Sequence, residues 1–487
     1  MTFPDFTIVN ATVVDGTGAP GFVADVAVAG DRILSVAPPA NDATQGLVID
    51  GTDQVLAPGF VDVHTHDDWS VLAKPVHSDK TLQGVTSVVV GNCGISPFPA
   101  TDNQPSLPAF DRLSDYFAAL AEARPAVNVS ALVGHGSIRS AVMGLRTNRA
   151  PDRDETKELL RLTKDAMDDG AIGMSSGLAY EPGRYAAPDE MTGLATVVAE
   201  AGGIYTTHMR DEADTLLDSI DESIAVAESS GVALQISHLK AAGANNWGAV
   251  NQALERIETA RGRGVDVMAD QYPYTRGSTL LEQVVSGGGF DGPSAFGTLT
   301  TDEVIVAASP NNPDWEGKTV TEIAAEHHVD PRQMADLIVE AEGRDCVVVL
   351  DLMAEDDVRT VMANPVVMVG SDGIPLGDKP HPRLGHTYPR ILGRYVREFK
   401  LLSLPEAIHR MTQMPAQRFG FTDRGEIRPG AYADLVLFDP ATVLDTGTYT
   451  DPTTTPIGIN GVWVNGQHVI DTGKSTNNRP GQIITRP

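Results

Sequence analysis

The architecture of this 487-residue chain follows from one short run, Ala57-Pro58-Gly59-Phe60-Val61-Asp62-Val63-His64-Thr65-His66. Its apolar residues predict a buried β-strand, and the strand ends in two histidines. Residues two apart in a strand point to the same face, so His64 and His66 project together from the strand end. Two converging imidazoles suit a divalent transition metal, zinc first. Taken alone, the motif is short and equally compatible with a surface pair that binds nothing.

Downstream of this run, apolar strand-like segments alternate with helical segments, which is typical of a parallel α/β sheet. The predicted helices include Asp154 to Asp169, ended by Gly170, and Asp211 to Ser230, ended by Gly231. Eight strand–helix units in about 320 residues predict a TIM-like (β/α)8 barrel over residues 57–420. The predicted strands are 57–66, 85–92, 127–135, 171–176, 203–208, 233–238, 265–270 and 366–372.

The barrel pattern is interrupted once and flanked by two strand-rich ends. An insertion at about 275–345 contains a Gly287-Gly288-Gly289 run, and we expect it to form a lid over a site. Residues 1–56 and 421–487 read as short strands, with a hairpin turn at Asn465-Gly466. We predict that both ends build one small β-sandwich domain, and two unrelated terminal hairpins are the alternative.

The composition excludes several classes of partner. A net charge of −29 argues against nucleic acid and anionic membrane surfaces, since both need a basic face. The two cysteines, Cys93 and Cys346, imply no disulfide framework and favour a reducing compartment. No secretory leader and no membrane-spanning window is recognisable, so we expect a cytoplasmic protein. The oligomeric state cannot be read from the sequence.

Five of the predicted strands end in a potential metal ligand or acid–base residue. A TIM barrel brings the carboxyl ends of its strands together around one pocket, so residues scattered along the chain would meet there. We therefore predict one shared metal site. Its candidates are His64 and His66 after the first strand, Cys93 after the second, His208 after the fifth, His238 after the sixth and Asp372 after the last.

The ligand types indicate the chemistry. Three nitrogen or sulfur ligands with an open position are typical of catalytic zinc, which lowers the pKa of bound water towards neutrality. A carboxylate beside the metal, Asp372, can take a proton and pass it to a leaving amine. Hydrolysis of an amide or a related C–N bond is therefore the predicted reaction class.

Most of the chain resembles the amidohydrolase superfamily, and within it the D-aminoacylases (N-acyl-D-amino-acid deacylases). The motifs that carry the resemblance are residues 58–66, the run 84–94 (GVTSVVVGNCG) and the run 428–436 (RPGAYADLV). Many amidohydrolases bridge two metals with a carboxylated lysine after the fourth strand, where this chain has Gly173-Met174-Ser175-Ser176-Gly177. The resemblance implies that Cys93 takes the place of that lysine. It also implies zinc-dependent cleavage of the amide of N-acyl-D-amino acids.

The resemblance further assigns roles to single residues. It implies that Cys93, His208 and His238 hold a tightly bound zinc, and that His64, His66 and Asp372 form a weaker second position, with Asp372 as general acid/base. The residues that would grip the α-carboxylate of the small-molecule substrate are Lys240, Tyr272 and Arg383. We expect Arg210 and Glu212 to form supporting or loop ion pairs, and the sequence gives no reason to place Glu212 beside the metal as a proton-shuttling group.

Substrate preference and reaction class leave alternatives open. Members of the family that prefer acidic D-amino acids carry an additional arginine after the Tyr-Pro-Tyr motif, and no arginine occurs between Arg276 and Arg332. We therefore predict neutral or hydrophobic N-acyl-D-amino acids as substrates, and the Gly287–Gly289 run makes a widened acyl pocket an option. The alternatives are a cyclic-amide hydrolase of the hydantoinase or dihydroorotase kind, a deaminase, or a non-catalytic scaffold on the same barrel.

Overall fold

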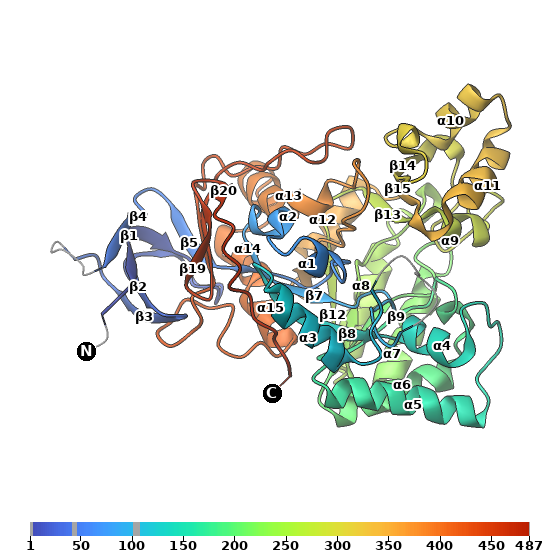
Figure 1. Cartoon of the computed structure of the whole chain (residues 1–487), viewed down its shortest axis with the longest axis horizontal. Coiled ribbons are helices and arrows are strands. Elements are labelled where there is room, and N and C mark those ends of the chain that lie inside the picture. The colour runs from blue at the N-terminus through green and yellow to red at the C-terminus, as the bar shows by residue number, and fades with distance from the viewer. Residues whose placement is uncertain (1–2, 41–45, 101–107, 487) are drawn as a thin grey trace.

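The computed structural model describes residues 3–40, 46–100 and 108–486. Figure 1 shows a small sheet domain at one end, the barrel in the middle and an inserted segment that projects at the other end. No helix in these described ranges is long and apolar enough to cross a membrane.

A ring of parallel strands forms the barrel. Within the described residues its eight strands are, in pairing order, β6 (Phe60–Asp62), β7 (Val85–Val90), β8 (Asn128–Gly134), β9 (Gly173–Gly177), β10 (Ile204–His208), β11 (Ala233–Ile236), β12 (Val267–Gln271) and β16 (Val367–Val369). A parallel bridge between Thr65 and Gly373 joins β16 back to β6 and closes the ring. Val61, Leu132 and Met368 belong to one apolar cluster although they come from separate parts of the ring. The predicted TIM-like barrel is confirmed.

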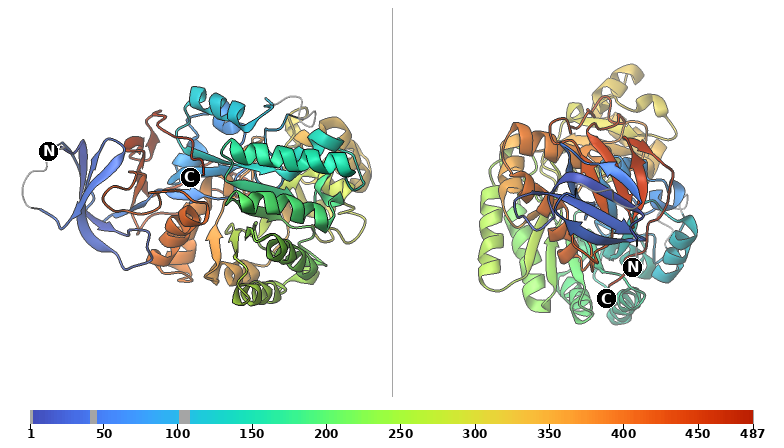
Figure 2. Two further views of the ribbon diagram at one scale, coloured as in Figure 1. Left: turned by 90° about the horizontal axis from the view of Figure 1, so that it is seen from below. Right: turned by 90° about the vertical axis from the view of Figure 1, so that its left-hand side faces the viewer.

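Helices cover the outside of the ring, as Figure 2 shows most clearly in its left view. They are α1 (Ser70–Ala73), α2 (Ser78–Thr81), α3 (Leu113–Ala123), α4 (His135–Met143), α5 (Arg153–Asp168), α6 (Pro188–Glu200), α7 (Leu216–Ser230), α8 (Val250–Gly262), α12 (Glu355–Ala363), α13 (Arg383–Arg390), the π-helical η6 (Ile391–Glu398), α14 (Leu404–Met411) and α15 (Gln413–Arg418). The sequence pattern reproduces α5 to within one residue at each end.

The start of α7 differs from the prediction of a helix from Asp211. The Asp211 carboxylate accepts hydrogen bonds from the N–H groups of Ala213 (2.6 Å) and Thr215 (3.3 Å), which favours a turn over a helix. The helix therefore begins only at Leu216. The Ala242 N–H donates to the Glu212 carbonyl at 2.7 Å, so the loop 209–215 that results is tied to the segment that follows β11.

The inserted segment forms its own small layer between β12 and α12. It contains a three-stranded antiparallel sheet, of β13 (Arg276–Leu280), β15 (Val347–Asp351) and β14 (Val304–Ala308), together with the helices α9 (Leu281–Ser286), α10 (Val320–His327) and α11 (Pro331–Glu342), among the described residues. Since β15 pairs with β13, the segment extends to Asp351, slightly beyond its predicted end at about residue 345. Helices α10 and α11 lie at the far edge of the molecule in Figure 1.

Strands from both ends of the sequence form a second, mixed sheet. Its strands in the described part of the chain are β1 (Phe6–Val13), β2 (Phe22–Ala29), β3 (Arg32–Ala37), β4 (Leu47–Asp50), β5 (Val55–Pro58), β17 (Leu435–Phe438), β18 (Ile459–Val464), β19 (Gln467–Asp471) and β20 (Lys474–Ser475). β5 pairs with β17 and so joins the two groups into one hydrogen-bonded sheet. The Phe6 and Trp463 rings stack with centroids 5.7 Å apart, and the right view of Figure 2 shows the N-terminal strands in front of the C-terminal ones. Both ends therefore share one core, and the alternative of two unrelated hairpins is wrong.

Candidate active site

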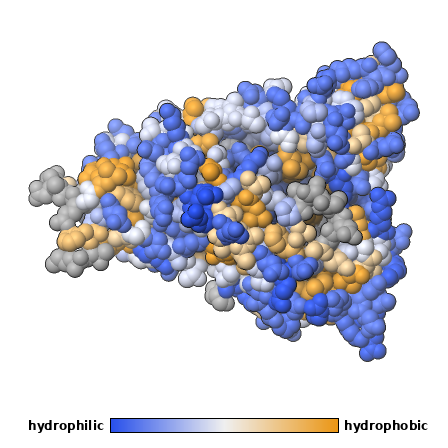
Figure 3. Space-filling model, viewed as in Figure 1, coloured by the Kyte–Doolittle hydropathy of each residue, from blue (hydrophilic) through white to orange (hydrophobic). Residues whose placement is uncertain are grey.

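A cavity of about 470 Å³ opens at the carboxyl ends of the barrel strands. In Figure 3 the surface is notched on the right between the projecting insertion and the body of the barrel. The barrel supplies the polar wall of the cavity, and the insertion supplies much of the apolar wall. The residues that line it include His66, Cys93, Tyr180, His208, Glu212, His238, Lys240, Tyr272, Leu280, Phe296, Arg344, Leu350, Leu352 and Asp372.

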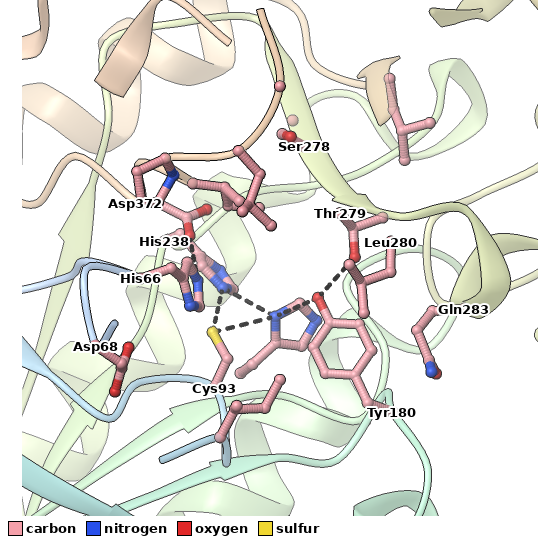
Figure 4. A pocket seen from close by; sticks show the side chains of 18 of the residues that line it. His66, Asp68, Cys93, Tyr180, His238, Ser278, Thr279, Leu280, Gln283 and Asp372 are labelled. Carbon is pink, nitrogen blue, oxygen red and sulfur yellow. Dashed lines mark hydrogen bonds and ion pairs between the residues drawn. The ribbon is translucent and has the colours of Figure 1, made fainter. Parts of the chain in front are cut away.

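Cys93 lies at the centre of the predicted metal ligands. Its Sγ is 3.3 Å from His64 Nε2, 3.6 Å from His238 Nε2 and 3.8 Å from His208 Nδ1. His208 Nδ1 and His238 Nε2 are themselves 2.9 Å apart. Cys93, His66, His238 and Asp372 converge in Figure 4. Residues from the β7, β10 and β11 strand ends are thus brought together as predicted.

A second group adjoins the first through His64. His66 Nε2 is 3.1 Å and His64 Nε2 is 3.4 Å from Asp372 Oδ1. The same nitrogen of His64 therefore faces both Cys93 and Asp372. All six predicted ligands form one continuous polar cluster.

The donor set fits zinc. One thiolate and two imidazoles are ligands that zinc prefers, and bond lengths of about 2.0–2.3 Å place neighbouring ligands roughly 3.3–3.6 Å apart. The Cys93–His238 separation of 3.6 Å matches that spacing, and the Cys93–His208 separation of 3.8 Å is slightly longer. The His208–His238 nitrogens are closer, at a hydrogen-bond distance of 2.9 Å, so a bound ion would spread these two rings.

Three of the clustered residues adopt a left-handed backbone that non-glycine residues rarely use. The φ angles are 51° for Cys93, 36° for His238 and 51° for Asp372. Such conformations cost about 1–3 kcal/mol each and persist where the surroundings hold them. The His238 N–H donates to Asp270 Oδ1 at 2.8 Å, and the Asp372 N–H donates to the His64 carbonyl at 2.7 Å. The barrel thus fixes these side chains against a local conformational preference.

Charge in the cluster favours the ionised forms of its acidic groups. Burial opposes ionisation of Cys93, but the neighbouring His64, His208 and His238 hold the pKa of its thiol well below the usual value. Burial likewise opposes ionisation of Asp372, but Arg383 and His64 hold the pKa of that carboxyl well below its ordinary range. A thiolate and a carboxylate are the forms that bind a metal cation.

The three predicted substrate-binding residues lie on one side of this cluster. Lys240 and Tyr272 line the cavity, and their contact is a cation–π pair with the nitrogen 5.9 Å from the ring centre. Arg383 is fully buried behind Asp372: its Nη2 is 2.8 Å from Asp372 Oδ2, and its guanidinium lies 4.4 Å above the Tyr272 ring. Its Nε and Nη1 atoms have no hydrogen-bond partner among the described residues.

Glu212 forms one of the expected supporting ion pairs, and it also reaches a predicted metal ligand. Its carboxylate is 2% exposed, receives two hydrogen bonds from Lys240 Nζ at 2.7 and 2.8 Å, and lies 2.9 Å from His238 Nδ1. Burial opposes ionisation, but Lys240 and His238 hold the pKa of Glu212 well below its usual range. Its contact with His238 has no sequence signal, because Glu212 lies in the loop that replaces the predicted first turn of α7. Arg210 forms the expected loop ion pair, with Glu222 at 2.8 Å.

Sequence reasoning also missed three residues around the site. Asp270 lies one residue before the end of β12 and 3.2 Å from His64 Nδ1, so the strand-end argument applied to the other ligands would have found it. Lys80 donates to Asp62 and Ser371, each at 2.8 Å, and so supports the loop that carries Asp372. Arg344 also lines the cavity, although it lies outside the segment 276–332 in which an arginine for acidic substrates is expected. Its Nε is 3.5 Å from Glu282. No sequence signal marks these last two.

The glycine run 287–289 follows α9, and none of its residues lines the cavity within the described part of the chain. The apolar wall of the cavity includes Leu280, Phe296 and Leu350 instead. The glycines therefore give no support for a widened acyl pocket.

Comparison with known proteins gives a consistent result. The amidohydrolase family profile matches residues 47–470. An N-acyl-D-glutamate deacylase from Alcaligenes xylosoxydans xylosoxydans is 39% identical, over 99% of this chain and 96% of that protein. A D-aminoacylase from the same organism is 37% identical, over 99% of this chain and 98% of its own length.

A solved structure is similar along the whole chain. It is the crystal structure of N-acyl-D-glutamate deacylase from Bordetella bronchiseptica, complexed with zinc and a phosphonate inhibitor that mimics the tetrahedral intermediate of the reaction. The identity is 38% and the TM-score is 0.91, with 99% of this chain and 100% of that chain covered.

Proposed function

This chain belongs to the amidohydrolase family, and from that premise we propose that it hydrolyses the amide bond of N-acyl-D-amino acids in a zinc-dependent reaction. The products are a carboxylate and a free D-amino acid. The observation that carries the proposal is the convergence of Cys93, His208 and His238 within 3.8 Å of one another at the cavity floor. Asp372 Oδ1 lies 3.4 Å from His64 Nε2, which in turn lies 3.3 Å from Cys93 Sγ.

Cys93, His208 and His238 would hold the tightly bound zinc. His64, His66 and Asp372 would form a weaker second position, which shares Cys93 as its neighbour at 3.3 Å from His64. When bound, zinc supplies a Lewis acid that polarises a carbonyl oxygen and activates water near neutral pH. The chain itself must then bind the substrate, orient it and move a proton.

Asp372 is the group placed to move the proton. As a carboxylate it can accept a proton at Oδ1 or Oδ2 and donate it to the nitrogen that leaves when the amide C–N bond breaks. Arg383 holds Asp372 Oδ2 at 2.8 Å and so fixes the direction of the carboxylate. Lys240 and Tyr272 line the cavity beside this carboxylate, and with the buried Arg383, whose guanidinium stacks on the Tyr272 ring, they are the residues we assign to the substrate α-carboxylate.

The test of the reaction is amine release from N-acetyl-D-leucine by the wild type and by Asp372→Asn. We expect kcat to fall by about 10²–10⁴-fold in the variant, as is typical when a general acid/base is removed. Tightly bound zinc should stay near the wild-type content, because Asp372 is outside the proposed tight set. The control is Asp356→Asn, which removes a carboxylate from the exposed surface of α12. Full activity of Asp372→Asn would contradict the role of Asp372.

The apolar wall supports a preference for neutral or hydrophobic side chains. Leu280, Phe296, Leu350 and Leu352 line the side of the cavity formed by the insertion and its neighbouring loop. Arg344 is the cation in that region, and Glu282 at 3.5 Å compensates its charge. A side-chain carboxylate would therefore face apolar groups and an arginine that already has an acidic neighbour.

A substrate panel tests this preference. We expect N-acetyl-D-leucine, -D-methionine and -D-phenylalanine to be hydrolysed with higher kcat/KM than N-acetyl-D-glutamate, N-acetyl-D-aspartate or any L-enantiomer. Stronger turnover of the two acidic substrates would contradict the preference and would point to Arg344 as their partner. Hydantoin and dihydropyrimidine belong in the same panel, since turnover of these alone would favour the cyclic-amide alternative.

The deaminase alternative needs a glutamate that can shuttle protons beside the metal. Glu212 is near enough and lines the cavity, but both of its oxygens accept hydrogen bonds from Lys240 and it lies 2.9 Å from His238 Nδ1. Its carboxylate is therefore already engaged by Lys240 and His238, which does not favour the deaminase alternative. The cytoplasmic location stays a prediction from the sequence.

A further inference from the structure

We infer that Glu212 is a positioning residue that aims two zinc ligands, His208 and His238, at the metal position. The inference rests on the metal site proposed above, since it concerns the ligands of that site. It gives a function to a buried carboxylate that neither the reaction nor substrate binding uses.

The two imidazoles turn one nitrogen each towards Cys93 and the other towards Glu212. His208 Nδ1 and His238 Nε2 are the nitrogens near the sulfur, at 3.8 and 3.6 Å. On the opposite side, His238 Nδ1 is 2.9 Å from Glu212 Oε1, and His208 Nε2 is 3.8 Å from Glu212 Oε2. One carboxylate therefore presents a separate oxygen to each ring.

This arrangement is the one that metal ligation requires. A ring nitrogen that binds a metal carries no proton, so the other nitrogen must carry it and donate it to an acceptor. Glu212 is the acceptor for His238 Nδ1–H. His208 Nε2 is buried and has no hydrogen-bond partner among the described residues, and Glu212 Oε2 is the anionic atom that faces it. The carboxylate thereby selects the tautomer in which both inner nitrogens are free for zinc.

Lys240 and the backbone hold Glu212 in place. Lys240 Nζ donates to both carboxylate oxygens, at 2.8 and 2.7 Å, and supplies the countercharge that a buried carboxylate needs. The Glu212 carbonyl accepts from the Ala242 N–H at 2.7 Å, and its N–H donates to the Ala295 carbonyl at 3.3 Å. Lys240 Nζ is also 2.8 Å from His238 Nδ1. Once that nitrogen carries its proton it cannot accept from Lys240, and the hydrogen bonds of Lys240 go to Glu212.

The test measures zinc affinity in the absence of substrate. Full-length wild type and Glu212→Gln are stripped of metal and titrated with zinc against a chelator of known affinity. We expect the variant to bind zinc about 10–100-fold more weakly, which is the usual effect of losing a carboxylate that orients a ligating histidine. Cobalt-loaded protein reports the ligand set, and we expect the thiolate-to-cobalt and d–d bands of the variant at saturation to match those of the wild type.

Glu190→Gln is the matched control. Glu190 is also buried, accepts from His135 Nε2 at 2.8 Å and pairs with Arg139, but it touches no predicted ligand. We expect its zinc affinity to equal that of the wild type. Glu212→Asp is the second variant if Glu212→Gln does not fold: it keeps the charge for Lys240 but draws the carboxylate away from both rings, and should also weaken zinc binding.

Two results would overturn the inference. Equal zinc affinity in wild type, Glu212→Gln and Glu212→Asp would show that Glu212 does not orient the ligands. Shifted d–d bands in cobalt-saturated Glu212→Gln would make Glu212 itself a ligand. Failure of the wild type to bind zinc would instead contradict the proposed metal site, so the two failures are distinguishable.

Discussion

At the scale of single residues, Cys93 and Cys346 are chemically different thiols although both are buried. Burial, with the nearby Glu342 and Glu316 carboxylates, raises the pKa of Cys346 to about 12. The imidazoles around Cys93 overcome the effect of its burial and hold its pKa well below the usual value. Cys93 also lines the cavity, so its thiolate is reachable by a small reagent.

This difference predicts selective labelling. In metal-stripped native protein, iodoacetamide should modify Cys93 and leave Cys346 unmodified, as read by mass spectrometry of the tryptic peptides. Added zinc should slow the labelling of Cys93, because a metal-bound thiolate is a weaker nucleophile. Cys93→Ser is the control and should take up no label. Equal labelling of both cysteines in the folded protein would contradict the conclusion that Cys93 is an accessible thiolate and Cys346 is not.

The residues found from the sequence and those missed differ in what fixes their position. His64, His66 and Asp372 follow strands, and strand geometry together with the barrel places a strand end within a narrow region. Glu212 reaches the cluster through a loop, whose path depends on hydrogen bonds of Asp211 and Ala242 that no periodicity encodes. Arg344 lies in an insertion whose position over the barrel depends on packing between distant segments.

At the scale of elements, a buried ion cluster ties α6 to α4. Glu190 near the start of α6 accepts from His135 Nε2 at 2.8 Å and pairs with Arg139, both of α4. Burial opposes the charge, but His135 and Arg139 hold the pKa of Glu190 below its ordinary value. The folded state therefore binds the Glu190 proton less tightly than the unfolded state does, and stability rises with pH across that range.

The lowered pKa of Glu190 determines how the stability of the protein changes with pH. The contribution of Glu190 to stability is fully present above its unfolded pKa, about 4.3, and is lost as pH falls through the lower folded pKa. We expect the free energy of unfolding in urea to fall less steeply between about pH 5 and pH 3 in Glu190→Gln than in the wild type. If the unfolding free energies of the two proteins fall in parallel as the pH is lowered, Glu190 does not stabilise the folded state through its charge.

Element boundaries show where pattern-based prediction works. Helix α5 was placed to within one residue because Asp152 and Glu155 form a capping box that starts it, and its apolar spacing is regular. The predicted start of α7 was five residues early because the side chain of Asp211 competes with the helix for backbone N–H groups. All eight barrel strands were found, most of them as short apolar runs that end in polar residues. The predicted first strand, 57–66, was too long, because residues 57 and 58 belong to β5 of the terminal sheet and β6 is only Phe60–Asp62.

At the scale of the whole molecule, the terminal sheet joins segments from opposite ends of the sequence. Trp463 of β18 is 2% exposed and stacks on Phe6 of β1, with His468 stacked on it at 4.4 Å. Composition and turn signals predicted that both ends form strands. They could not give the pairing of β5 with β17, because pairing between distant strands leaves no local signature.

Removing this aromatic contact should destabilise the protein as a whole. We expect Trp463→Ala to cost about 3–5 kcal/mol of unfolding free energy in urea, which is the usual cost of deleting a large buried side chain. Phe22→Ala is the control, since Phe22 lies on β2 of the same sheet but is 44% exposed. Similar unfolding midpoints for the two variants would contradict the view that Trp463 links the two groups of strands.

The pairing of β5 with β17 has a consequence during synthesis on the ribosome. Roughly 370 residues separate the two strands, which amounts to about 20–75 s of translation at typical elongation rates. Until β17 emerges, the N-terminal strands present an open edge that other chains can pair with. The nascent chain is thus at risk of aggregation for most of its synthesis, and holding chaperones that bind the first 60 residues should raise the yield of folded enzyme.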